Sequence, residues 1–209
     1  MLSFDCCLDR ISVAVSDKDG NVLASQTHEN HFDACAILAL MIAKILKNVS
    51  ATMKDVSVCI TTVGPGSFTG IRTGLSTAYG IAAANPNIRI CGITSFEALL
   101  ASYNEQNALP AKDIVIAIDT KRNDYYFLDV SKTLSPQIGV ADQIICLAKG
   151  LGVGTVITNK PDGFSYSERI DIIEQKIRAE ALFKAADLEN LANQPLRPFY
   201  LKDAGVTVK

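Results

Sequence analysis

The chain has 209 residues, of which 48% are hydrophobic, and its 20 lysines and arginines are nearly balanced by 22 aspartates and glutamates. A chain of this length and composition can bury a core large enough to fold without disulfide bonds or a structural metal, which excludes a disordered or disulfide-dependent protein. The balanced charge also excludes a broad basic surface for nucleic acid, so we expect any such contact to be made through a partner protein.

The first half of the chain predicts the element order βββαβαβα. Its strands are marked by alternating apolar residues between short polar turns, and its helices by apolar residues at intervals of three and four. Thr94 and Glu97 have the spacing of a capping box, so the last of these helices is expected to begin at Thr94 and to continue through Ser102. The other expected elements, in chain order, are strands over residues 2–7, 11–16 and 22–26, a helix over 32–48, a strand over 56–63, a helix over 70–84 and a strand over 89–93.

The polar stretch of residues 103–112 interrupts this pattern and is the best candidate for a domain boundary. After it, an apolar strand ends in Asp119 before a polar turn and a second strand, just as the first strand of the chain ends in Asp5 before its own turn. This likeness predicts two related half-domains, one over residues 1–103 and a smaller one over residues 113–209. The expected elements of the second half are strands over residues 114–119, 125–130 and 155–158, helices over 167–178 and 184–193, and an extended tail from Pro195.

The most distinctive segment is a glycine-rich loop between the strand over 56–63 and the helix over 70–84. Its glycines can adopt positive φ, and Ser67 or Thr69 can cap the first turn of the helix. Free N–H groups at a helix start attract anions, so the loop is a candidate ligand cradle. The alternative is a rigid turn that sets helix against sheet, and the absence of P-loop or dinucleotide-binding spacing favours it. The residues of this signature loop are Gly64, Pro65, Gly66, Ser67, Phe68, Thr69, Gly70 and Arg72.

The helix over residues 32–48 carries more apolar side chains than one buried face requires. At about 100° per residue, four of them form one face and three others extend past it. The surplus is covered either by helices of the same chain or by another chain, and the residues alone leave both covers open. The first face comprises Cys35, Leu38, Ile42 and Ile45, and the residues beyond it are Ile37, Leu40 and Met41.

Six cysteines lie inside apolar runs without a Cys-x-x-Cys pair, so we expect small buried side chains in a reducing cytosol. No basic segment precedes the first apolar run, which argues against a signal peptide. The longest apolar run, residues 34–43, is well short of the ~20 residues needed to span a bilayer. We therefore expect a cytoplasmic protein without membrane contact. The cysteines are Cys6, Cys7, Cys35, Cys59, Cys91 and Cys146.

Four motifs of this chain occur in the order found in one protein family. They are Gly64–Gly74, Gly92–Leu99, Ile118–Arg122 and Pro198–Lys202. On these motifs the chain resembles the TsaB family, also called YeaZ, whose members take part in forming threonylcarbamoyladenosine at position 37 of certain transfer RNAs. The resemblance implies an α/β chain with the actin-like, Hsp70-like ATPase (ASKHA) fold, built from two ribonuclease-H-like half-domains.

The resemblance also implies a subunit that is not itself an enzyme. The paralogous catalytic subunit, TsaD, binds its metal through two histidines four residues apart, where this chain has Ser95 and Leu99, and a leucine side chain offers no lone pair. Nucleotide-binding relatives of the fold have a glycine-containing phosphate hairpin after the first aspartate, where this chain has Cys6 and Cys7. We therefore expect no catalytic residue, no metal and no cofactor of its own, and the role of the two cysteines stays open.

The partners implied by the resemblance are a TsaD-like catalytic subunit and a TsaE-like ATPase, with transfer RNA contacted only through the complex. ATP and a metal ion are then expected on the partner subunit, and any ligand of the signature loop is expected to be shared with a partner. Family members pair through helices of the first half, and the same apolar helix also makes a homodimer plausible when the partner is absent. The residues assigned to this partner-binding surface are Ile37, Leu38, Met41, Ile42 and Ile45.

Two enzymatic alternatives belong to the same superfamily, a glycoprotease-type metallopeptidase and a small-molecule kinase. The first needs the missing histidine pair, and the second needs the missing phosphate hairpin. His28 and His31 are the only histidines, and no Cys, Asp or Glu pattern completes a zinc set around them. Polar residues ahead of the next helix are therefore the favoured interpretation of both histidines.

Overall fold

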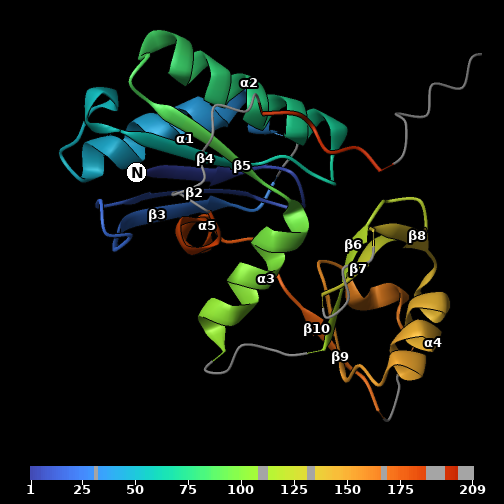
Figure 1. Cartoon of the computed structure of the whole chain (residues 1–209). Helices are drawn as coiled ribbons and strands as arrows, with labels where there is room; N and C mark the ends of the chain where they lie inside the picture. Colours follow the sequence, from blue (N-terminus) through green and yellow to red (C-terminus); the bar gives the residue numbers. More distant parts are fainter. Residues whose placement is uncertain (31–32, 108–112, 131–134, 166–168, 187–195, 202–209) are drawn as a thin grey trace, which may run out of the picture.

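The computed structural model describes residues 1–30, 33–107, 113–130, 135–165, 169–186 and 196–201. Within these residues the chain forms two five-stranded mixed sheets, and helices pack against both (Figure 1). Among the helices of the described ranges, none has the length and hydrophobicity to cross a membrane.

The first sheet has the strand order β3-β2-β1-β4-β5, and its strands β1, β2 and β4 are buried along their whole length. Antiparallel pairing joins β1 to β2 and β2 to β3, whereas β1, β4 and β5 run parallel. The bounds are Leu2–Asp5 for β1, Ile11–Ser16 for β2, Val22–His28 for β3, Val58–Thr62 for β4 and Arg89–Ile93 for β5.

Helices cover both faces of this sheet because side chains alternate between faces along each strand. Phe4 and Cys59 point to the side of α1 and α2, whereas Ala14 and Ile60 belong to the core on the side of α3 and α5. Figure 1 shows α1 and α2 on one side of the sheet and α3 and α5 on the other. The bounds are Ala34–Asn48 for α1, Phe68–Ala84 for α2, Ser95–Gln106 for α3 and Ala179–Ala185 for α5, and a short 3-10 turn, η2, spans Met53–Asp55.

The second sheet repeats the strand order of the first, as β8-β7-β6-β9-β10. Helix α4, Ala141–Leu151, covers one face through Ile144 and Ala148. The other face contributes Ile116 and Ile157 to the core that also contains Phe96 of α3. The bounds are Ile114–Asp119 for β6, Tyr125–Asp129 for β7, Gln137–Gly139 for β8, Thr155–Thr158 for β9 and Asp171–Glu174 for β10, and the 3-10 turn η3 spans Pro161–Gly163.

Helix α5 crosses back from the second sheet to the first. It packs against α3, β1 and β2, and the hydroxyl group of Ser3 donates a hydrogen bond to the Ala179 carbonyl oxygen at 2.7 Å. Its Leu182 is fully buried in the core shared by the two sheets. The expected second half-domain over residues 113–209 therefore has to be divided before α5, because this helix completes the first half.

The elements of the first half lie where the sequence predicts them, with ends shifted by a few residues. The capping box is present, since Thr94 and Glu97 exchange hydrogen bonds at the start of α3.

The second half departs from the expected elements. The expected helix over 167–178 is wrong: Asp171–Glu174 is a strand paired in parallel with β9. Neither β8 nor α4 is among the expected elements. The expected helix over 184–193 starts earlier, as α5, and residues 187–195 lie outside the described ranges.

Two of the six cysteines depart from the expected burial. Cys35 on α1 and Cys146 on α4 are exposed, while Cys6, Cys7 and two cysteines of the strands are buried. All six thiols are free. Both exposed cysteines lie on the solvent side of an amphipathic helix, where an apolar run in the sequence does not imply burial.

The structure corrects the assignment of the α1 residues to a partner-binding surface. Four of them, Leu38, Met41, Ile42 and Ile45, are buried in the core between α1 and the first sheet, and Ile37 is half-buried beside it. The large apolar side chain on the outward face is Leu40, which is 68% exposed. A helical wheel groups residues that share a face but does not say which face the sheet covers.

This orientation of α1 predicts effects of very different size for two leucines two positions apart. Leu38→Ala leaves a cavity in the core and is expected to lower the free energy of unfolding by about 2–5 kcal/mol. Leu40→Ala removes a side chain already in water and is expected to change it by less than about 0.5 kcal/mol. Urea unfolding of the two variants beside the native chain measures both. Equal losses would contradict the placement of α1.

Candidate functional site

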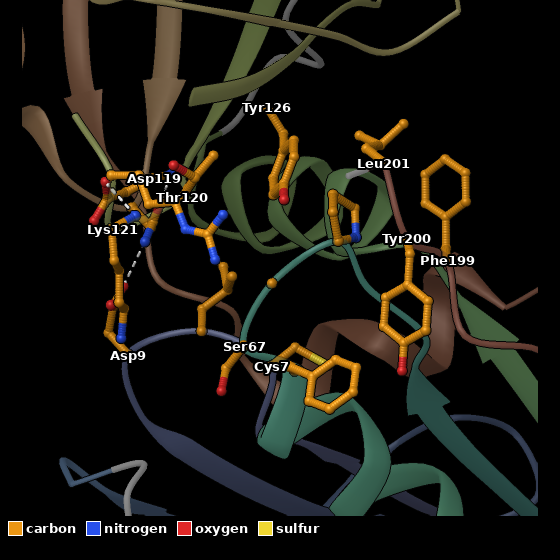
Figure 2. Close-up of a pocket in the computed structure, with 16 residues that line it drawn as sticks. Cys7, Asp9, Ser67, Asp119, Thr120, Lys121, Tyr126, Phe199, Tyr200 and Leu201 are labelled. Atoms are coloured by element: carbon orange, nitrogen blue, oxygen red, sulfur yellow. Dashed lines mark hydrogen bonds between the residues drawn. The ribbon is translucent and has the colours of Figure 1, made fainter. Parts of the chain in front are cut away.

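A cavity of about 230 Å³ lies between the two halves of the molecule. Its walls come from the turn after β1, the signature loop, the turn after β6 and residues Phe199–Leu201 of the tail (Figure 2). Asn159, at the end of β9, and Tyr126 of β7 complete the lining. The cavity therefore occupies the cleft at which the two Asp-ended hairpins face each other.

The signature loop is held directly against the first hairpin. The Ser67 N–H donates a hydrogen bond to the Cys7 carbonyl oxygen at 2.7 Å, and the Cys6 thiol donates one to the Gly70 carbonyl oxygen at 3.2 Å. A Cβ atom on Gly70 would overlap the Cys6 carbonyl oxygen, so only glycine permits this approach. The Ser67 hydroxyl caps α2 by accepting from the Gly70 N–H at 3.2 Å. These contacts agree with the favoured prediction from the sequence, a rigid turn that sets α2 against the sheet.

Asp5 ends β1 beneath this contact and is completely buried. One carboxylate oxygen accepts hydrogen bonds from the Cys7 N–H at 3.1 Å and from the Thr62 hydroxyl, and the other has no hydrogen-bond partner within the described residues. Burial raises the pKa of Asp5 to about 6, against the opposing effect of these two hydrogen bonds. Asp5 is not part of the cavity lining.

The Cys7 thiol lies at the same depth and is fully buried. It is 3.0 Å from the Thr62 hydroxyl, and burial together with the Asp5 carboxylate raises the pKa of this thiol well above its usual value. A thiol that stays protonated is a poor nucleophile and a poor metal ligand. Cys7 therefore acts here as a small buried side chain.

The carboxylate of Asp119, which ends β6 before the second hairpin turn, has partners within the protein. Asp119 accepts from the Lys121 N–H at 3.0 Å and lies 3.8 Å from the Lys160 ammonium group. Asn159 links the two halves across the cavity, because its oxygen accepts from the Asp119 N–H at 2.8 Å and its amide donates to Asp9 at 2.7 Å. Figure 2 shows Asp9, Asp119 and Lys121 together on one side of the cavity. Both carboxylates that face the cavity are thus already paired.

The two positions that the resemblance matches to the metal-binding histidines of TsaD are completely buried. Ser95 and Leu99 are 0% exposed, and the Ser95 N–H donates to the Gly64 carbonyl oxygen at 2.7 Å. In the described parts of the chain, no group of three or more His, Cys, Asp or Glu residues is placed to hold a metal ion. His28 lies 3.2 Å from Asp33, directly ahead of α1, and His31 lies outside the described residues.

The signature loop contributes only part of its residues to the cavity. Pro65, Gly66, Ser67 and Phe68 line it, whereas Gly64, Thr69, Gly70 and Arg72 do not. Arg72 instead places its guanidinium group 3.7 Å above the Phe68 ring. The motifs Ile118–Arg122 and Pro198–Lys202 supply seven further lining residues, and Cys7 is an eighth that the sequence analysis names. The lining residues that the sequence-based expectations miss are Leu8, Asp9, Tyr126 and Asn159.

The buried Asp5 carboxyl predicts a specific pH dependence of stability. Its pKa of about 6 in the folded chain exceeds the ordinary 3.8, so the folded state binds this proton more tightly. The stabilisation is fully present below pH 3.8 and is lost as the pH rises through 6, a change of roughly 3 kcal/mol. Asp5→Asn should remove this loss. Urea unfolding of both chains from pH 4 to 7 measures it, and identical slopes would contradict the prediction.

Comparison with known proteins places the chain in a family. The family model for TsaD, tRNA N6-adenosine threonylcarbamoyltransferase, matches residues 13–183. The chain is 31% identical over 136 residues to the tRNA threonylcarbamoyladenosine biosynthesis protein TsaB of Haemophilus influenzae, a match covering 62% of this chain and 53% of that protein. With the protein of the same name from Escherichia coli the identity is 26% over 137 residues, or 63% and 55% of the two chains. The chain thus spans little more than half the length of these curated relatives.

Solved structures share the fold over a larger part of the chain. A Pseudomonas aeruginosa protein with similarity to peptidase YEAZ superposes with a TM-score of 0.72 at 19% identity, over 96% of this chain and 98% of that one. YeaZ from the same organism gives 0.67 at 20% identity, over 88% of each chain. The activator of the 2-hydroxyisocaproyl-CoA dehydratase from Clostridium difficile, solved with bound ADPNP, gives 0.52 at 10%, over 89% of this chain and 92% of the activator. The fold is therefore ASKHA-like, and the chain belongs to the family of the TsaD model and, within it, to the TsaB (YeaZ) group.

Proposed function

We propose that this chain is a non-catalytic subunit in the formation of threonylcarbamoyladenosine at position 37 of transfer RNA, and that it supports transfer by a TsaD-like catalytic subunit. The assignment to this process is supported by its curated relatives, which are named tRNA threonylcarbamoyladenosine biosynthesis protein TsaB. The observation that carries the non-catalytic role is the contact between Ser67 and Cys7, in which the Ser67 N–H at the start of α2 is bonded to the hairpin after β1 and is not free to bind a phosphate. The paired Asp9 and Asp119 add no free group to the cleft.

In this proposal the reactive groups are held by the partners. A TsaD-like subunit binds ATP and the metal ion, a TsaE-like ATPase acts on the assembled complex, and transfer RNA contacts the complex rather than this chain alone. The nearly balanced charge of the chain fits such indirect contact with RNA. The metallopeptidase alternative is not favoured, because the two positions that would carry its histidines are a serine and a leucine without exposed surface.

The outward face of α1 and α2 is the surface that best suits the TsaD-like subunit. The two helices lie side by side, and Cys35 of α1 is 3.0 Å from Thr73 of α2. Apart from Leu40, Lys44 and Lys47, the exposed side chains of this face are small, and small residues let a partner helix approach closely. It replaces the buried set expected from the sequence. The exposed residues of this face are Ala36, Ala39, Leu40, Ala43, Lys44 and Lys47 of α1 and Ser76, Gly80 and Ala83 of α2.

Reconstitution tests the non-catalytic role. The purified chain is mixed with ATP, threonine, bicarbonate and transfer RNA, with and without the cognate TsaD-like and TsaE-like proteins. We expect the modified nucleoside only when the partners are present, and a strong loss of product when this chain alone is left out. Turnover by the isolated chain would overturn the proposal, and so would full activity of the partners without it.

A charge on the outward helix face tests the partner surface. Leu40→Glu is expected to abolish co-elution with the TsaD-like subunit, because a carboxylate at the centre of an apolar contact loses its hydration without gaining a partner. Leu23→Glu is the matched control, since Leu23 is 55% exposed on the edge strand β3. Circular dichroism verifies that both variants are folded. If Leu40→Glu co-elutes as well as Leu23→Glu, the partner binds elsewhere.

A further inference from the structure

The chain crosses twice between the two halves, and the second crossing, residues 175–179, is attached on both sides. It leaves the second half at Gln175, whose N–H donates a hydrogen bond to the Thr158 carbonyl oxygen of β9 at 2.8 Å. It enters the first half at Ala179, the first residue of α5. The first crossing runs from α3 to β6. Any rotation of one half against the other therefore has to bend the segment Ile177–Ala179, here called the clamp.

Three buried serines of the first half bind the backbone of the clamp. The Ser12 hydroxyl of β2 accepts a hydrogen bond from the Ala179 N–H at 2.9 Å, and the Ser3 hydroxyl of β1 donates one to the Ala179 carbonyl oxygen at 2.7 Å. The Ser102 hydroxyl of α3 accepts from the Arg178 N–H at 2.9 Å. All three serines are 0% exposed, so no water competes for these bonds. Serines from three separate elements thus share one role, the attachment of the clamp.

A mostly buried arginine adds a second attachment at the start of the clamp. The Arg10 guanidinium group, after β1, donates through Nε and Nη2 to the Ile177 carbonyl oxygen at 3.2 and 3.0 Å, and 15% of this side chain is exposed. Glu29 lies 3.8 Å from Arg10 and 3.4 Å from the Lys176 ammonium group. The exposed ion pairs add little, whereas the two charge-assisted bonds of Arg10 are strong.

Apolar packing joins the two halves next to the clamp. One core contains Ile116 and Ile157 of the second sheet together with Phe96 of α3 and Leu182 of α5. Ile177 of the clamp belongs to the same core and is 1% exposed. Rotations of lobes normally take place at hinges, where a few loop residues change φ and ψ. At this crossing the same change would break buried hydrogen bonds and separate a close-packed core.

We propose that the clamp locks the two halves into one rigid body, so that the cleft between them keeps a single width in solution. The bonds of the clamp come from β1, β2, α3 and the turn after β1, so a rotation of one half must break several of them at once. Closure of two lobes around a ligand is a common transition in proteins, and the clamp excludes it here. The lock concerns the isolated chain and does not depend on the proposed function.

The two exposed cysteines allow the lock to be measured in the full-length chain, because Cys35 lies on α1 of the first half and Cys146 on α4 of the second. Nitroxide labels on these two thiols report the distance between the halves by double electron–electron resonance. The other four cysteines are buried and stay unlabelled. A reference pair within the first half, Cys35 with Leu23→Cys in a Cys146→Ser chain, gives the width that label motion alone produces. We expect the native chain to show one distance peak no wider than this reference.

Loss of the serine hydroxyls should release the lock. Ser12→Ala and Ser102→Ala, combined in one chain, remove the acceptors of the two clamp N–H groups. In this variant we expect a wider peak or a second distance between the halves. Hydrogen exchange of the peptide that contains the clamp should accelerate roughly tenfold or more, because two buried N–H groups lose their acceptors. Ser25→Ala, at an exposed position of β3, is the matched control and should change neither.

The distance between the labels decides the proposal. A broad or double distance between the halves in the native chain, beside a narrow reference, would overturn it. A double serine variant that is folded by circular dichroism and keeps the native peak would overturn it as well, because the lock would then not reside in the clamp. If this variant does not fold, Arg10→Gln takes its place with the same two outcomes, since it removes the charge-assisted bonds to the Ile177 carbonyl oxygen.

Discussion

The contact between the first turn of α2 and the turn after β1 is the constraint on which the rest of this structure depends. Two backbone segments approach within hydrogen-bond distance there, through Ser67 and Cys7, and the missing side chain of Gly70 makes room for the approach. The contact fixes α2 against the sheet. It also uses the Ser67 N–H, at the start of α2, in a hydrogen bond within the protein, where it cannot bind a phosphate. The contact that makes this loop rigid thus also occupies the Ser67 N–H.

The chemistry beneath this contact follows from its tightness. Asp5 and Cys7 are sealed between β1, β4 and the loop, so solvent cannot stabilise their charged forms. Burial raises the pKa of Asp5 to about 6, and it keeps the Cys7 thiol protonated, which makes this thiol a poor nucleophile and a poor metal ligand. Cys7 also lines the cavity, together with Asp9 and Asp119, whose carboxylates are both paired. Burial therefore accounts for the raised pKa values of both Asp5 and Cys7.

Sequence patterns predicted the first half better than the second for physical reasons. The first half has long periodic segments and a capping box at Thr94, so element types follow from local signals. The isoleucines around Asp171–Glu174 fit a helix or a strand equally, and the pairing with β9 that decides between them is not local. The covered face of α1 is likewise set by the sheet rather than by its own sequence. The cavity was not predictable as a whole, because its walls come from segments far apart in the chain.

Helix α2 connects the features that sequence reasoning treated separately. Its start is held by the first hairpin through Gly70, one flank contacts the tail segment Leu196–Leu201 through Phe68 and Tyr79, and the other flank meets α1 at Thr73. Its remaining outward side belongs to the proposed partner surface. A partner bound there would contact a helix whose first turn is already fixed, so binding costs little ordering of the backbone.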